Sequence, residues 1–145
     1  MASVTSYTGR TGLVLGFQEG ATSGSYAIGD LVKTDSNGQV VIATGGKILG
    51  IARRGYTGTQ ASTVEVELID PNEIYVIQYK ASATNQNLVG VECDLVYTVG
   101  AHTVDSAATT YDEVEIVGLH PGDAVATSGG RLLVRFKPGL NLLAR

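Results

Sequence analysis

Strict alternation of apolar and polar residues is the feature that most constrains how this chain can fold. The segment Thr63 to Leu68 reads TVEVEL, and Arg131 to Lys137 reads RLLVRFK between a glycine pair and Pro138. A period of two places successive side chains on opposite faces of a strand. Val, Ile and Thr supply 40 of the 145 residues and Gly supplies 19, a mixture that suits strands joined by tight turns. The pattern therefore predicts an all-β protein.

The segment 29–55, GDLVKTDSNGQVVIATGGKILGIARRG, contains the clearest hairpin. Asn37 and Gly38 form its turn, because both residues tolerate the positive φ that a tight hairpin requires. We predict strands at Asp30 to Lys33, Gln39 to Thr44, Lys47 to Arg53, Leu13 to Gln18, Leu88 to Thr98, Glu113 to Leu119 and Val125 to Ala126, with one helical turn at Leu140 to Ala144.

The length of the chain predicts one domain with one hydrophobic core. Residues 1–11 are polar and without pattern, and we expect an arm that is either frayed or ordered by contact with another molecule. Residues 12–145 are predicted to form a single β-rich domain, a small antiparallel β-barrel or β-sandwich.

The segment Glu73 to Lys80 differs from the alternating strands because both of its faces are apolar. A strand of this kind is covered on two sides. Since so small a domain has no obvious internal cover for the second face, we expect a partner subunit to supply it, most simply in a homotrimer.

Charge and composition exclude several classes of protein. The net charge is −4 with only 10 Lys and Arg, which disfavours direct binding to nucleic acid. No stretch approaches the ~20 apolar residues of a membrane helix, and the first residues lack the features of a signal peptide. We therefore expect a soluble, unprocessed protein made in the cytoplasm.

The chain contains no recognisable catalytic or metal-binding motif. His102, His120 and Cys93 lack the short spacings of a zinc site, and the carboxylates form no acid and base pair. Neither GxGxxG nor GxxxxGK followed by Ser or Thr, the two patterns of phosphate-binding loops, is present. The glycine-rich tail motif of the small trimeric dUTP pyrophosphatases is also missing. We expect no enzymatic activity, no metal and no cofactor.

Several segments resemble the capsid cement (decoration) proteins of tailed bacteriophages. The likeness runs from about residue 12 to 137 and is carried by Gly29-Asp30-Leu31-Val32, Asn37-Gly38, Ile48 to Ala52, Asn87 to Gly90, Asp94 to Val96, Glu115 to Leu119 and Ser128 to Phe136. The resemblance implies a β-rich module on the outer surface of the virion, often trimeric, that binds the major capsid protein and reinforces the joints between its subunits. These motifs are turns and core strands, so no functional residue is carried over from the family.

Candidate contact residues come from the arm, from the end of one strand and from the two-faced strand. They are Ser3, Tyr7, Arg10, Arg53, Arg54, Tyr56, Tyr75 and Tyr79. Arg53 and Arg54 mark either a contact patch or a solvated strand end. A receptor- or glycan-binding module of a phage tail or fibre is the alternative function: the seven tyrosines favour it, whereas the absence of Trp weakens it.

Overall fold

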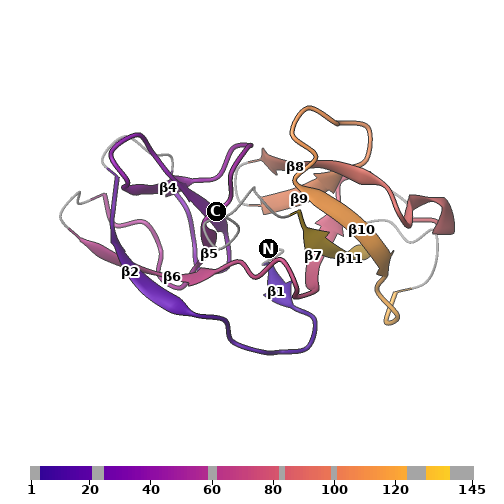
Figure 1. Ribbon diagram of the computed structural model, residues 1–145, viewed down its shortest axis with the longest axis horizontal. Coiled ribbons are helices and arrows are strands. Elements are labelled where there is room, and N and C mark those ends of the chain that lie inside the picture. The colour runs from indigo at the N-terminus through magenta and orange to yellow at the C-terminus, as the bar shows by residue number, and fades with distance from the viewer. Residues whose placement is uncertain are drawn as a thin grey trace.

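The computed structural model describes residues 4–20, 25–58, 62–81, 84–98, 101–123 and 130–137. These residues form strands and one short 3-10 helix, as the alternation predicts (Figure 1). The strands are β1 Thr5–Ser6, β2 Val14–Gln18, β3 Leu31–Thr34, β4 Val40–Ile42, β5 Gly50–Ala52, β6 Thr63–Leu68, β7 Tyr75–Tyr79, β8 Glu92–Thr98, β9 Ala101–Asp105, β10 Val114–Leu119 and β11 Arg131–Phe136, with the 3-10 helix at Gln86–Leu88.

The second half of the chain closes into a five-stranded barrel. The strand order is β1-β7-β11-β10-β8-β9, and β9 pairs again with β7, so that β7 to β9 form a ring with β1 attached outside it. The closing pair is parallel, with Gln78 opposite Thr103 and Tyr79 opposite Val104. Of the two predicted architectures, an antiparallel barrel or a sandwich, this half is a barrel, and only its closing pair is parallel.

The first half forms a separate five-stranded sheet in the order β2-β6-β5-β3-β4. Its two outer strands approach at one end, where Glu19 forms an isolated bridge with Val40. The two halves lie side by side along the long axis of the molecule (Figure 1). β6 ends the first half and β7 begins the second, with only residues 69–74 between them.

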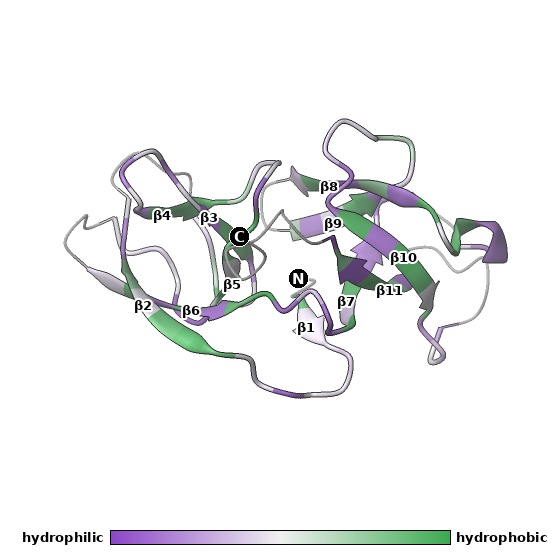
Figure 2. Cartoon of the chain, viewed as in Figure 1, coloured by the Kyte–Doolittle hydropathy of each residue, from purple (hydrophilic) through white to green (hydrophobic). Residues whose placement is uncertain are grey.

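The buried apolar side chains of the described residues form two clusters instead of the single predicted core. One lies within the first sheet and contains Val32, Val64 and Val66, whereas the other fills the barrel and contains Tyr75, Phe136 and their neighbours. The barrel cluster also includes Leu31, Ala43, Ile48 and Ile51 from the first half. The two halves therefore share an apolar junction, and Figure 2 shows apolar (green) segments in strands of both halves.

Local geometry explains two of the glycines. Gly38 adopts φ 76°, and the carboxylate of Asp35 accepts hydrogen bonds from the N–H groups of Asn37 and Gln39 across the predicted turn. Gly50 lies opposite Leu68 where β5 pairs with β6, and a Cβ atom there would collide with the carbonyl oxygen of Glu67. A side chain at position 50 is thus incompatible with this close approach of the two strands.

The predicted strands agree with the structure, mostly with slightly shorter bounds, apart from three differences. The sequence pattern missed β1 and β9, and the predicted strand Leu88 to Thr98 begins with a 3-10 helix. Residues 4–8 also differ from a free arm, because Val4 is buried and β1 pairs with β7. The predictions for Val125 to Ala126 and Leu140 to Ala144 lie outside the described residues.

Candidate functional site

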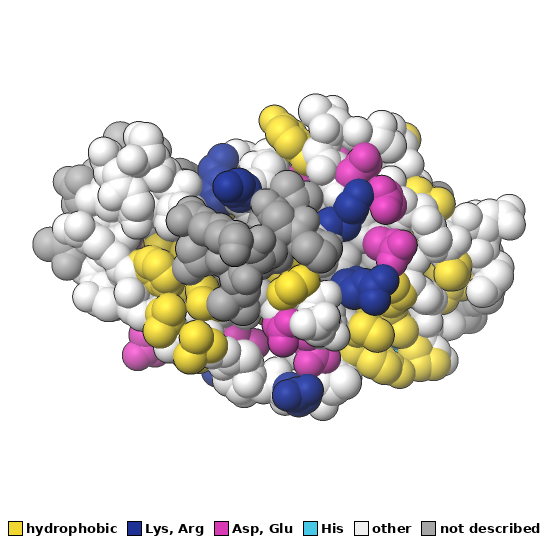
Figure 3. All heavy atoms as spheres, in the orientation of Figure 1, with side chains coloured by type: hydrophobic (Ala, Val, Ile, Leu, Met, Phe, Trp, Pro, Cys, Tyr) yellow, Lys and Arg dark blue, Asp and Glu magenta, His cyan; other side chains and the backbone are white. Residues whose placement is uncertain are grey.

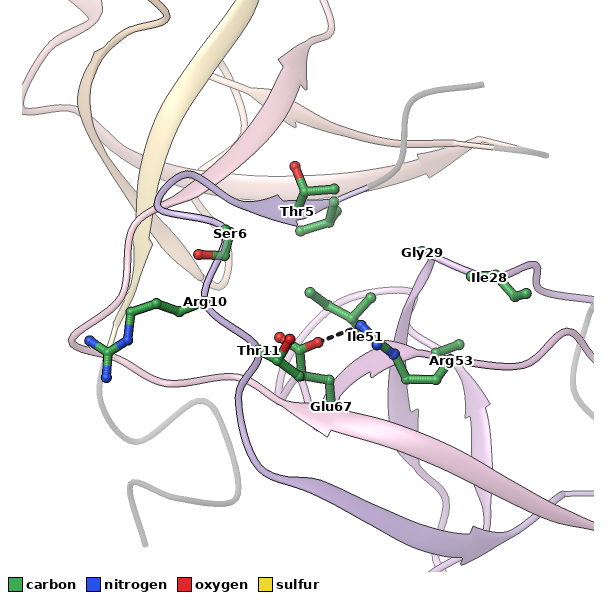
Figure 4. Close-up of a pocket in the computed structure, with 12 residues that line it drawn as sticks. Thr5, Ser6, Arg10, Thr11, Ile28, Gly29, Ile51, Arg53 and Glu67 are labelled. Carbon is green, nitrogen blue, oxygen red and sulfur yellow. Dashed lines mark hydrogen bonds and ion pairs between the residues drawn. The ribbon is translucent and has the colours of Figure 1, made fainter.

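A pocket of about 280 Å³ lies between the N-terminal segment and the first sheet (Figure 4). Val4 anchors the segment, because its side chain is buried and its N–H donates to the carbonyl oxygen of Gly29 at 3.1 Å. The chain then passes Glu67 near the end of β6 before it enters β2. The pocket is therefore formed by the arm and by residues of the first half, among them Ile51 and Glu67.

The wall of this pocket carries one ion pair. Nη1 of Arg53 lies 2.8 Å from Oε1 of Glu67, and the second carboxylate oxygen accepts the N–H of Gly12 at 3.1 Å. Glu67 is buried although it lies in a strand whose alternation predicted exposure, because residues 10–12 cover it. Both carboxylate oxygens of Glu67 are thus hydrogen-bonded within the chain, so this carboxylate serves the fold.

The pocket brings together two of the predicted contact residues. Arg10 and Arg53 both line it, although they are 43 positions apart in the sequence. Tyr7 lies on the same N-terminal segment. Its side chain is 43% exposed, and its ring stacks edge to face with that of His120, with the ring centroids 5.9 Å apart. Ser3 lies outside the described residues.

Arg54 and Tyr56 do not line this pocket. Nη1 of Arg54 donates to the carbonyl oxygen of Thr63, and the Tyr56 ring packs against Tyr26 at 5.5 Å. Burial, followed by the nearby Glu19 carboxylate, raises the pKa of Tyr26 to about 12.

Tyr75 and Tyr79 are wrong as surface contacts. Tyr75 is 1% exposed, packs edge-on against Phe136 and accepts the Asp70 N–H through its hydroxyl oxygen, while the hydroxyl of Tyr79 lies 2.6 Å from that of Ser106. Both rings point into the barrel, since they alternate along β7 with the half-buried Val76 and Gln78. A sequence with apolar residues on both faces does not reveal which face is buried.

His102, on β9, joins the two halves and was not among the predicted site residues. Its Nδ1 accepts the N–H of Leu31 at 3.3 Å, and its Nε2 donates to the carbonyl oxygen of Ala43 at 2.9 Å. This pattern requires the neutral ring protonated on Nε2. Burial accordingly lowers the pKa of His102. His102 and Val104 share one face of β9, a pattern that would indicate burial, but no strand was predicted there.

A second buried junction is built on Glu113. Its carboxylate accepts the N–H of Gly46, from the first half, at 3.0 Å and the N–H of Leu95, from the barrel, at 2.7 Å. Burial raises the pKa of Glu113, and these two hydrogen bonds oppose that shift. Asp94 acts in the same way nearby, accepting the N–H groups of residues 110–112. The buried carboxylates therefore hold loops together.

The described residues offer no reactive constellation. Among them, no three His, Cys, Asp or Glu side chains are close enough to hold a metal ion. Cys93 is fully buried, and burial raises the pKa of its thiol to about 12, so the nucleophilic thiolate is disfavoured. Within the same ranges, no helix is long and apolar enough to cross a bilayer.

The surface carries two apolar patches on the face shown in Figure 3. One lies over β2 and the other over β10 and β11. In and next to β2, Leu13, Val14 and Leu15 are exposed, and Leu133 of β11 is half-buried. Exposed apolar patches on a folded protein are typical of binding surfaces.

Comparison with known proteins identifies no relative of this chain. No protein-family model, curated protein or solved structure matches it.

Proposed function

We propose that this protein is a capsid cement (decoration) protein, which binds the outer surface of an icosahedral phage capsid and stabilises the contacts between major capsid protein subunits. The sequence resemblance over residues 12–137 carries the proposal. The segments that bear it are scaffold elements: Leu31 and Val32 belong to β3, Gly50 to Ala52 form β5, and Arg131 to Phe136 form β11.

The use of the ionisable side chains supports binding rather than catalysis. His102, Glu113 and Asp94 are buried and hydrogen-bonded to backbone groups, so their chemistry is committed to the fold. Among the described residues, five basic side chains form ion pairs with carboxylates: Arg53, Lys80, Arg131, Arg135 and Lys137. Half of the chain's 10 Lys and Arg side chains are thus paired within the chain, so apolar and backbone contacts to a partner are expected to dominate.

Binding of this kind stabilises a shell through linkage. A molecule that binds the assembled shell and not the separated subunits stabilises it by RT ln(1 + [L]/Kd) per site, which is about 2.7 kcal/mol at a hundredfold excess over Kd. An icosahedral shell repeats each site many times, so modest contributions add up against the pressure of the packaged DNA.

The proposal is tested with capsids that lack the protein. We expect saturable binding, a higher temperature of DNA release, and a shallow dependence of Kd on salt. Tyr7→Ala, at the exposed arm, is expected to weaken binding. Tyr111→Ala is the control, because Tyr111 is 53% exposed, against 43% for Tyr7, but packs beside Gly45. Absence of saturable binding, or equal release temperatures, would refute the proposal.

The glycan-binding alternative predicts a different result. Sugar-binding surfaces gather exposed aromatic rings, whereas the exposed Tyr7 and Tyr111 lie against different elements, next to His120 and Gly45 respectively. Binding of the purified protein to a glycan array, with none to capsids, would favour this alternative.

A further inference from the structure

β2 is an edge strand of the first sheet, and it carries exposed apolar side chains. It pairs with β6 on one side, and the bridge between Glu19 and Val40 lies just beyond its end. Leu13, Val14 and Leu15 are 58%, 36% and 40% exposed. Proteins normally protect such edges with charges, proline or bulges, but the segment TGLVLGFQ, residues 11–18, contains neither a charged residue nor proline.

The hydrogen bonds show which backbone groups face the open edge. The carbonyl oxygen of Leu13 accepts the N–H of Leu68 at 2.8 Å, so the odd-numbered residues of β2 direct their backbone groups toward β6. Val14 and Gly16 therefore direct theirs away from β6. Gly20 has the same parity, and its N–H reaches the carbonyl oxygen of Val40, on the side away from β6. Among the described residues, no strand covers the edge at Val14 and Gly16.

The sequence of this edge is symmetric. Gly12-Leu13-Val14-Leu15-Gly16 reads the same in both directions. In an antiparallel pair centred on Val14, each Leu13 lies opposite Leu15 of the other copy and each Gly12 lies opposite Gly16. Leucines from both copies then gather on one face, because Leu13 and Leu15 share a face of the strand. No charged side chains are opposed in this segment, although each chain carries a net charge of −4.

We propose that β2 is a self-association surface, through which two copies of this chain pair antiparallel about a two-fold axis at Val14 and join their first sheets into one. Val14 exchanges backbone hydrogen bonds with its symmetry mate, and each Gly16 N–H donates to the Gly12 carbonyl oxygen of the other copy. The arrangement is isologous and therefore closes as a dimer. It differs from the trimer expected from β7, whose tyrosines are buried within the chain.

Sedimentation of the full chain, with a charge variant, tests the surface. We expect a dimer, and we expect Val14→Lys to raise its dissociation constant on the order of tenfold, since two ammonium groups then meet at the axis. Val14 is 36% exposed, so the monomer of the variant should keep the wild-type fold, with an unchanged circular dichroism spectrum. Ile28→Lys is the control, because Ile28 is 64% exposed and lies outside β2.

A cysteine cross-link tests the register independently. Residues of a hydrogen-bonded antiparallel pair have Cα atoms ~5.5 Å apart, within the range that a disulfide spans. We expect Val14→Cys to form a covalent dimer on oxidation and Ile28→Cys to remain uncoupled, while the buried Cys93 stays unreacted. The proposal would be overturned if the full chain sediments as a monomer or a trimer, or if Val14→Lys leaves the dimer intact. It would also be overturned if the β2 amides are protected from hydrogen exchange only on a capsid.

Discussion

Replacement of His102 by Leu removes the hydrogen bonds that this ring makes between the two halves of the molecule. Leu is similar in size to His, so the main loss is polar. The N–H of Leu31 and the carbonyl oxygen of Ala43 lose their bonds to the ring, at 3.3 and 2.9 Å, in a buried junction. A buried backbone group without a partner costs about 1–3 kcal/mol. We therefore expect His102→Leu to reduce the free energy of unfolding by about 2–6 kcal/mol, a large share of the ~5–15 kcal/mol of a typical domain.

The wild-type protein should also become less stable in mild acid. Burial lowers the pKa of His102 below its ordinary value of 6.5, while the nearby Asp30 carboxylate and the bond to Ala43 oppose the shift. The folded state thus prefers the neutral ring, and the unfolded state binds the proton first. The stability contributed by this residue is complete above pH 6.5 and falls by up to about 1.4 kcal/mol per pH unit below it, until the folded ring is itself protonated.

Urea denaturation at several pH values measures both effects. The variant should have a lower midpoint at pH 8 and should lack the component of the acid slope that His102 supplies. His120→Leu is the matched control, because His120 lies in a turn at the surface, and its effect should stay below about 1 kcal/mol. An unchanged midpoint, or an unchanged slope between pH 6.5 and 5, would refute this account of the junction.

Three further predictions follow from burial and backbone geometry. Deletion of residues 2–10 should lower the free energy of unfolding by about 1.5–3 kcal/mol, measured by urea denaturation, because Val4 is buried; an unchanged value would show a free arm. Gly50→Ala should abolish soluble folded protein, whereas Gly55→Ala, with no atom closer than 3.6 Å to the new Cβ, should melt near the wild type. Cys93 should react with a thiol reagent only after unfolding; reaction in native buffer would contradict its burial.

Much of the secondary structure could be predicted from local pattern. Alternation located β6 and β11, and the Asn37-Gly38 turn located the hairpin of β3 and β4. These elements depend on periodicity and turn chemistry, which short stretches of sequence contain. β1 was missed because a strand of two residues is too short to show a period. β9 was missed because one of its two buried positions is the polar residue His102, the other being Val104.

Only the tertiary structure decided which polar residues matter. His102, Glu67 and Glu113 are buried because segments distant in the sequence cover them and supply their hydrogen-bond partners, at separations of 14 to 71 residues. The same long-range packing turned Tyr75 and Tyr79 inward and placed Arg10 and Arg53 in the lining of one pocket. Local sequence determines which face of a strand is apolar, whereas burial depends on what packs against that face.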